Sequence, residues 1–273
     1  MVFLRTTTTV AKPMEKSYVW GIDLGGTKIE CAVLSAADLT QVIARERIDT
    51  EAAKGYEHII SQVARLVSRV SEQLGVSPKR IGFATPGVLN PATQTMKNCN
   101  TTSMNGRPMA ADLTKALGVE VRLANDANCF ALAETHLGAV QDVNPKAEVV
   151  FGIIMGTGVG GGLVVHGQVI NGLHGIGGEW GHNILEEGGK ACYCGKSGCV
   201  EHVISGPALE EFYFSVSGQK LRMPQILQAH LAGTDIHASA TIERMLENFG
   251  RAVSTLINVL DPQVIVIGGG VGN

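Results

Sequence analysis

The sequence lacks three features that would place it in other classes of protein. It has no block of basic residues, and its net charge of −3 and pI near 6.2 are not those of a protein that binds the phosphate backbone of nucleic acids. The first 17 residues contain no long apolar segment of the kind that secretory signals require. One stretch without charged residues, 149–178, is broken by eleven glycines, whereas a membrane-spanning helix needs about 20 predominantly apolar residues. We therefore expect a cytoplasmic protein with neither nucleic-acid nor membrane partners.

Glycine, in contrast, is abundant, with 34 of the 273 residues, or about 12% against an average of about 7%. The glycines do not follow the Gly-X-Y period of collagen, and a hydrophobic content of 45% argues against a disordered chain. The length fits one large domain or two modest domains. Many of the glycines gather in five clusters, at residues 25–26, 156–162, 175–181, 188–198 and 268–270. The backbone therefore has to turn sharply, or approach another group closely, in several places.

Two parts of the chain begin with the same pattern of strand, glycine turn and strand. Residues 18–23 and 28–35 flank the first turn, and residues 149–155 and 161–165 flank the second. The other predicted elements are helices over 55–74, 108–117, about 128–137 and 238–260, and strands over 41–48, 81–84, 120–123, 168–170 and 263–267. We interpret the repeated pattern as an internal duplication within an α/β chain.

The duplication predicts a boundary between two lobes near residue 125, although no linker rich in proline or serine marks it. We expect a disordered or weakly ordered tail at 1–17, a small α/β lobe at 18–124 and a large α/β lobe at 125–273. The last predicted strand ends close to the end of the sequence, where a doubly wound domain would usually cover it with a further helix. We therefore expect the C-terminus to be shortened.

Three glycine turns that follow strands are candidate binding sites. In Asp23-Leu24-Gly25-Gly26-Thr27-Lys28, backbone amides form a concavity suited to an anion, beside an acidic residue that can hold hydrated Mg²⁺. Gly156-Thr157-Gly158 provides a second such turn, which is consistent with a nucleotide clamped between lobes. Gly268-Gly269-Gly270 ends a third strand, where ligands of open α/β sheets usually bind. The structural alternatives are an ordinary hairpin turn for the first motif and a helix cap or tight turn for the third.

Acidic residues provide candidates for proton transfer and for binding hydroxyl groups. Asp126 lies at a strand-to-helix junction between Asn125 and Asn128, where a carboxylate can accept a proton from a hydroxyl. Because Asn and Asp are preferred at helix N-caps, a purely structural N-cap is the alternative. Glu179 and Glu201 flank the cysteine cluster, and each is either a ligand for hydroxyls or an ordinary solvated carboxylate.

Half of the six cysteines fall within eight residues. Cys192, Cys194 and Cys199 have the spacing C-x-C-x₄-C, with glycines inside the loop. In a reducing compartment, clustered thiols indicate a metal more often than a disulfide. Such a loop can direct three thiolates at one Zn²⁺, and the imidazole of His182 would complete a tetrahedral, structural site. The alternative is incidental buried thiols, as we expect for the other three cysteines, Cys31, Cys99 and Cys129.

Taken together, these motifs resemble those of the ROK family, which comprises repressors, open reading frames and sugar kinases. The resemblance covers roughly residues 18–273, and the joint pattern is far more specific than any single motif. The matching segments, in the same order, are 23–28, 125–128, 156–158, 179–182 and 192–201. The resemblance implies a two-lobed fold of the actin, hexokinase and Hsp70 type (ribonuclease H-like), with duplicated mixed sheets flanked by helices and with ATP and sugar between the lobes.

The resemblance also implies an enzyme, an ATP-dependent hexose phosphotransferase, and a role for each motif. By this likeness Asp126 is the general base, and the sugar hydroxyls are held by Asn125, Asp126, Glu179, His182 and Glu201. His182 would also bind structural Zn²⁺ with Cys192, Cys194 and Cys199. The nucleotide of Mg·ATP would contact Asp23, Gly25, Gly26, Thr27, Lys28, Gly156, Thr157, Gly158, Gly268, Gly269 and Gly270.

The sugar is the least defined part of this likeness. Residues 97–108, 178–183 and 192–196 are similar to the bacterial fructokinase branch, whereas N-acetylglucosamine kinases and glucokinases share nearly all other motifs. We expect transfer to the 6-hydroxyl of fructose or mannose, with N-acetylglucosamine or glucose as alternatives, by a homodimer.

Two alternatives of another class remain, a sugar-responsive regulator and a non-catalytic sugar-binding protein. ROK repressors carry a helix-turn-helix domain before the first phosphate strand, and the 17 residues here are too few for one. This absence makes a role in DNA binding the weaker hypothesis.

Overall fold

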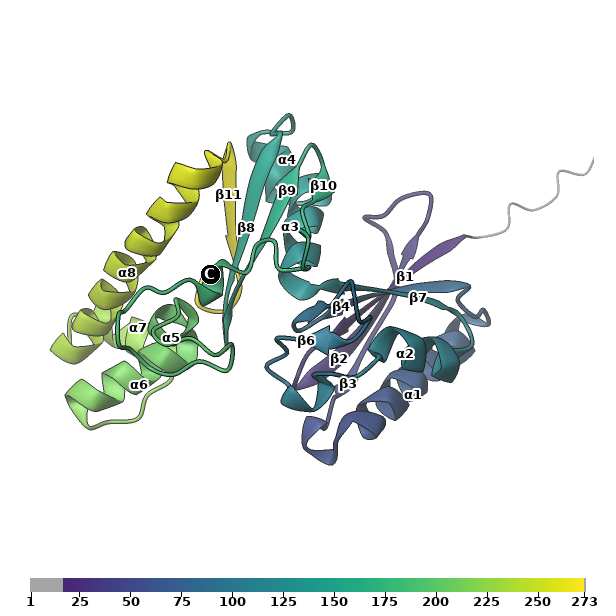
Figure 1. Cartoon of the computed structure of the whole chain (residues 1–273), viewed down its shortest axis with the longest axis horizontal. Helices are drawn as coiled ribbons and strands as arrows, with labels where there is room; N and C mark the ends of the chain where they lie inside the picture. Colours follow the sequence, from purple (N-terminus) through teal and green to yellow (C-terminus); the bar gives the residue numbers. More distant parts are fainter. Residues whose placement is uncertain (1–16, 273) are drawn as a thin grey trace, which may run out of the picture.

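The computed structural model describes residues 17–272, so the tail predicted at 1–17 lies, except for residue 17, outside the described residues. Two main sheets with helices packed against them, and one two-stranded hairpin, make up the described chain, and the first main sheet is complete before the second begins (Figure 1). None of the helices within residues 17–272 combines the length and the apolar character needed to cross a membrane.

The first sheet has five strands in the order β3-β2-β1-β4-β7. These are β1 (Tyr18–Leu24), β2 (Lys28–Ser35), β3 (Val42–Asp49), β4 (Arg80–Thr85) and β7 (Glu120–Asn125). The first three form the expected antiparallel meander, and β4 and β7 run parallel to β1. The helices α1 (Tyr56–Leu74) and α2 (Met109–Leu117) bury their apolar faces in the core of this sheet. A short hairpin that was not predicted, β5 (Val88–Leu89) with β6 (Met96–Lys97), follows β4.

The second sheet has four strands in the order β10-β9-β8-β11. These are β8 (Val149–Met155), β9 (Val159–Val165), β10 (Gln168–Val169) and β11 (Val264–Gly268). The helices α3 (Asp126–Leu137) and α4 (Ala139–Val143) lie on one side of it, and α8 (Ile236–Leu260) lies on the other (Figure 1). Before α8 come three helices that the sequence pattern did not reveal, α5 (Glu201–Ile204), α6 (Gly206–Ser217) and α7 (Met223–Leu231).

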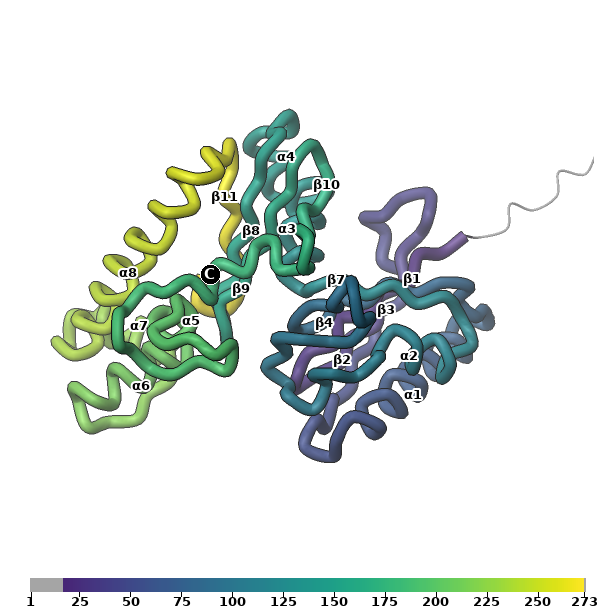
Figure 2. The backbone as a smooth tube through the Cα atoms, viewed as in Figure 1, coloured from purple at the N-terminus to yellow at the C-terminus, as the bar shows by residue number. Residues whose placement is uncertain are grey.

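The two sheets repeat one arrangement of strands. In each, a third strand, a second and a first lie antiparallel in that order, and a fourth strand is parallel to the first. This repetition confirms the predicted duplicated mixed sheets. The lobe boundary near residue 125 stays a prediction, to which the structure adds one fact. The chain passes directly from β7 into α3, and α3 packs on the second sheet (Figure 2).

Four glycines from three strands form a face of the second sheet on which α3 lies. They are Gly152, Gly160, Gly162 and Gly268. A Cβ atom built at Gly162 would lie 2.6 Å from the carbonyl oxygen of Ala127, and one at Gly152 would lie 2.6 Å from the Cβ of Ala131. Because these distances are shorter than any normal van der Waals contact, α3 packs directly on strand backbone. We call these four residues the glycine face.

We predict that Gly162→Ala destabilises the protein by about 1–3 kcal/mol, because the added methyl group overpacks the contact with α3. Gly250→Ala is the matched control. Gly250 lies inside α8 with no atom within 4 Å of an added Cβ, so this change should stabilise by about 0.5–1 kcal/mol through helix propensity. Urea unfolding measures both changes. Equal stability of Gly162→Ala and the wild type would show that α3 is not held at this distance.

Candidate active site

A cleft of about 220 Å³ has walls from both sheets. Pro86 and Gly87 follow β4 of the first sheet, and the turn 156–158 joins β8 to β9 of the second. Eight of the predicted site residues line this cleft: Asn125, Asp126, Gly156, Thr157, Gly158, Glu179, His182 and Glu201. The structure therefore brings together side chains and turns that are far apart in the sequence.

The first and third glycine turns are not among the residues that line the cleft. Asp23, which precedes the first turn, is nevertheless close enough to Asp126 for its charge to raise the pKa of that residue. The first turn closes as a hairpin, with the Gly25 amide donating to the Lys28 carbonyl at 2.9 Å, as the structural alternative predicted. The Thr50 hydroxyl also donates to the Gly25 carbonyl at 2.7 Å, so the end of β3 supports this turn.

The third glycine turn, at residues 268–270, packs on the end of β8. The Val271 amide donates to the Met155 carbonyl at 2.9 Å, and a Cβ atom at Gly269 would lie 2.3 Å from that oxygen. Gly269 has a φ of +89°, which a residue with a side chain rarely adopts. The third turn is thus placed immediately beside the second.

The N-terminus of α3 carries Asp126 as its first residue. The N-cap is Asn125, whose side-chain oxygen accepts from the Asn128 amide at 3.1 Å and whose Nδ2 donates to the Gly87 carbonyl at 3.2 Å. The N-cap alternative for Asp126 is therefore wrong, because its neighbour fills that position. One carboxylate oxygen of Asp126 accepts from the Ala127 amide at 2.8 Å.

Several carboxyl groups of the cleft have raised pKa values. Burial in the cleft raises the pKa of Asp126 to about 6, and the negative charge of Asp23 adds to this effect, although solvent still reaches the carboxylate. Burial, together with the charges of Asp126 and Glu201, raises the pKa of Glu179 to about 7. Burial and the charge of Glu30 raise the pKa of Asp23 as well. A site with this excess of negative charge is suited to a divalent cation and to hydroxyl donors.

Glu201 connects the second glycine turn to the cysteine loop. Its Oε2 accepts from the Val159 amide at 3.1 Å and would lie 2.4 Å from a Cβ atom at Gly158. Glu201 begins α5 two residues after Cys199. The alternative of an ordinary solvated carboxylate is therefore wrong for Glu201, because it braces the turn.

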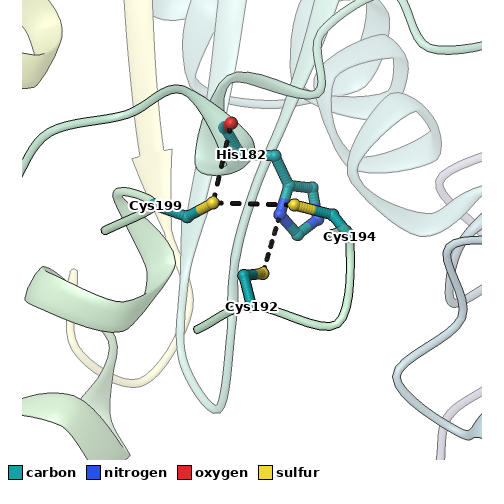
Figure 3. A group of neighbouring side chains, drawn as sticks. All are labelled: His182, Cys192, Cys194 and Cys199. Atoms are coloured by element: carbon teal, nitrogen blue, oxygen red, sulfur yellow. Dashed lines mark hydrogen bonds between the residues drawn. The ribbon is translucent and has the colours of Figure 1, made fainter. Parts of the chain in front are cut away.

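The four predicted metal ligands converge in the structure. The donor atoms of His182, Cys192, Cys194 and Cys199 all lie within 4.8 Å of one another. The Nδ1 atom of His182 is 3.5 Å from the Cys192 sulfur, and the Cys194 and Cys199 sulfurs are 3.6 Å apart (Figure 3). Three sulfurs and one imidazole nitrogen are a donor set that Zn²⁺ prefers, so the residues fit a structural zinc ion.

The other three cysteines have the surroundings of ordinary thiols, as predicted. Burial raises the pKa of Cys31 and of Cys99 to about 12, and that of Cys129 to about 11. Thiols that remain protonated at neutral pH are poor nucleophiles and poor metal ligands.

The residues that line the cleft without a predicted role include Gly87, Asn98, Asn100 and Tyr193. Asn98 and Asn100 flank the fully buried Cys99, so the alternation around one buried residue was a signal for them. Tyr193 occupies the x position of C-x-C, between two predicted metal ligands, where no local pattern indicates that a side chain enters a cleft.

Comparisons with known proteins agree with the motifs. The model of the ROK family matches residues 19–273. An N-acetyl-D-glucosamine kinase of Pasteurella multocida is 37% identical, covering 93% of this chain and 84% of its own length. Among solved structures, a ROK hexokinase from Thermus thermophilus is 34% identical with a TM-score of 0.77, covering 93% of this chain and 82% of its own. A ROK family glucokinase from Streptomyces griseus, in complex with glucose and AMPPNP, is 25% identical with a TM-score of 0.79. The match covers 93% of this chain and 84% of the glucokinase. These likenesses confirm the predicted two-lobed fold of the actin and hexokinase type.

We predict about one zinc ion per chain and its loss in Cys194→Ser, because a hydroxyl is a much weaker zinc ligand than a thiolate. Elemental analysis of the purified protein measures the ratio. Cys129→Ser is the control and should keep the metal, since Cys129 is not among the clustered donors. A folded wild-type protein without zinc, or a Cys194→Ser variant that retains it, would contradict the assignment.

Proposed function

The chain belongs to the ROK family, and on this basis we propose that it transfers the γ-phosphate of ATP to a hydroxyl group of a hexose. One observation carries the proposal. A carboxylate with a pKa near neutrality, Asp126, shares a cleft with a glycine turn and with three further groups able to hold hydroxyls, Glu179, His182 and Glu201.

Asp126 is the general base of the proposed reaction. Its pKa of about 6 keeps it deprotonated at neutral pH and close to the working pH, the condition under which a base is most effective. The proton of the sugar hydroxyl passes to the carboxylate, and the hydroxyl oxygen attacks the γ-phosphorus. The bond between that phosphorus and the bridging oxygen of the β-phosphate breaks, and ADP leaves with the electron pair. Asn125 holds the start of α3 and so fixes the direction of the carboxylate.

The glycine turns are proposed to bind the nucleotide. The Gly25 and Gly156 amides close the turns 25–28 and 156–158, and other backbone amides of these turns are the proposed donors for phosphate oxygens. The turn at 268–270 is proposed to lie against the adenosine. The contact between Val271 and Met155 supports this grouping, because it places the third turn beside the second. Mg²⁺, when bound, neutralises phosphate charge, and Asp23 is the residue proposed to hold it through water.

The sugar is proposed to be bound by cleft residues that can hold hydroxyls, which are Asn125, Asp126, Glu179, His182 and Glu201. His182 and Glu201 lie at the two ends of the cysteine loop, so a zinc ion there would hold both in place. N-acetylglucosamine is the first substrate to test, since the Pasteurella relative is an N-acetyl-D-glucosamine kinase. The predicted preference for fructose or mannose, transfer to the 6-hydroxyl and the homodimer stay predictions.

We predict that Asp126→Asn lowers kcat by about 10²- to 10⁴-fold while hexose affinity is retained, because an amide cannot accept the proton. In the wild type, protonation of Asp126 removes the base, so kcat/KM should fall about tenfold per pH unit below about pH 6. Coupled assay of ADP release measures both. The exposed Asp142→Asn is the control and should match the wild type. An undiminished rate in Asp126→Asn would exclude the proposed base.

We predict turnover with Mg·ATP for at least one sugar of a panel that contains N-acetylglucosamine, glucose, mannose and fructose. The ratio of kcat/KM values identifies the substrate, and NMR of the product identifies the phosphorylated hydroxyl. Hexose binding by calorimetry without turnover would instead identify a sugar-binding protein. If the protein neither binds nor phosphorylates any of the four sugars, the proposal is refuted.

A further inference from the structure

Tyr193 belongs to the cysteine loop, yet its side chain enters the cleft. It lies between Cys192 and Cys194, and it lines the same cleft as Asp126, Glu179 and Glu201. Its hydroxyl oxygen is 3.3 Å from Nε2 of His182. Its ring packs edge to face on the imidazole, with centroids 5.2 Å apart and an interplanar angle of 87°. At 46% exposure, the side chain is too open to serve as a core residue.

The two nitrogens of His182 have different surroundings. Nδ1 faces the Cys192 sulfur at 3.5 Å and is therefore on the metal side. When Nδ1 binds a metal, the ring proton is on Nε2, which leaves one donor directed toward the cleft. Two oxygens compete for it, Tyr193 Oη at 3.3 Å and Glu179 Oε2 at 3.7 Å, and only the first is within hydrogen-bond range. The single donor of His182 is thus taken by Tyr193.

This arrangement changes which group a sugar meets. A phenol hydroxyl both accepts and donates, so Tyr193 can accept from His182 and still direct its own proton to an acceptor. In the ligand-free cleft that acceptor is the Glu201 carboxylate, and a sugar oxygen would have to take its place. A sugar hydroxyl near His182 therefore has two options. It can accept a hydrogen bond from Tyr193, or it can displace Tyr193 from Nε2 of His182.

The position of Tyr193 is held by the loop on both sides. The Cys192 amide donates to the Lys196 carbonyl at 2.8 Å, and the Lys196 ammonium donates to the His182 carbonyl at 3.1 Å. The two neighbours of Tyr193 are both metal-ligand candidates. These bonds hold the backbone at Tyr193, and the contacts of its hydroxyl and ring with His182 hold the side chain, so little side-chain freedom is lost when a ligand binds.

We propose that Tyr193 is a sugar-contacting residue that receives the His182 proton donor and presents its own hydroxyl to the hexose. The inference rests on the proposed function and adds a residue that selects among hexoses. The phenol fills space beside Glu179, His182 and Glu201, so it limits the size of the substituent that a sugar can place there.

Tyr193→Phe tests the contact, since it removes the hydroxyl and keeps the ring. In the full chain with its zinc, KM for the sugar should rise about 3- to 15-fold, the equivalent of one hydrogen bond. KM for ATP, kcat and the zinc content should stay within about twofold of the wild type. A merely structural defect would change these three quantities as well. Tyr18→Phe, in β1 and outside the cleft, is the matched control and should leave all four quantities unaltered.

Tyr193→Ala tests the selection. Removal of the ring should shift the kcat/KM ratio of N-acetylglucosamine to glucose upward, because the acetamido group is the bulkier substituent. An unchanged ratio would overturn the selective role, and an unchanged sugar KM in Tyr193→Phe would overturn the contact. Loss of zinc in Tyr193→Phe would assign Tyr193 to metal-site structure instead and overturn the proposal.

The outcomes separate this inference from the proposed function. If the wild type turns over a hexose and Tyr193→Phe does so with the same KM, only the inference fails. If the wild type turns over no hexose, the proposed function fails, and calorimetric hexose affinities of the wild type and Tyr193→Phe then test the contact by themselves. Equal affinities in that experiment would refute it.

Discussion

The close approach of α3 to the glycine face is the interaction on which the cleft depends. α3 starts one residue after the last strand of the first sheet and packs on the backbone of the second. Because no side chain separates Ala127 from Gly160 and Gly162, the first residue of the helix, Asp126, lies in the same cleft as the turn 156–158. The glycine excess therefore has two physical causes. Some glycines form turns, and others allow a helix to approach a sheet more closely than any side chain permits.

The cleft brings carboxyl groups together at a cost in stability. Asp23, Asp126 and Glu179 all have pKa values raised above those of free side chains, chiefly by burial. A group whose pKa is higher in the folded state stabilises the fold while it is protonated. This contribution is lost as the pH rises from 3.8 to about 6 for Asp126 and from 4.5 to about 7 for Glu179. At neutral pH these charges therefore oppose folding of the ligand-free protein. The same charges are suited to hydroxyl donors and to a cation, so stability is exchanged for a prepared site.

The cysteine loop links the metal candidates to both binding regions. Glu201 reaches from α5 to the turn 156–158, and His182 and Tyr193 face the region proposed for the sugar. Within the described residues, the loop is shaped by backbone hydrogen bonds and by glycines with positive φ, such as Gly195 and Gly198, rather than by an apolar core of its own. A bound metal would supply the rigidity that such a loop otherwise lacks.

By itself, the sequence determined the elements and groups that local patterns encode. The apolar stripes of α1 and α8, the strands on both sides of the first two glycine turns and the C-x-C-x₄-C donors were all predicted, because helix spacing, turn chemistry and ligand chemistry act over a few residues. The helices α5 to α7 and the hairpin β5–β6 were not, since short elements carry little periodicity. Tertiary structure alone decided that Asn125 rather than Asp126 caps α3, that Glu201 braces a turn, and that the Tyr193 hydroxyl lies within hydrogen-bond distance of His182. The cap of α3 is a local contact whose position also depends on the hydrogen bond from Asn125 to Gly87. The contacts of Glu201 and Tyr193 join residues farther apart in the sequence, which meet only when the cysteine loop closes beside the turn 156–158.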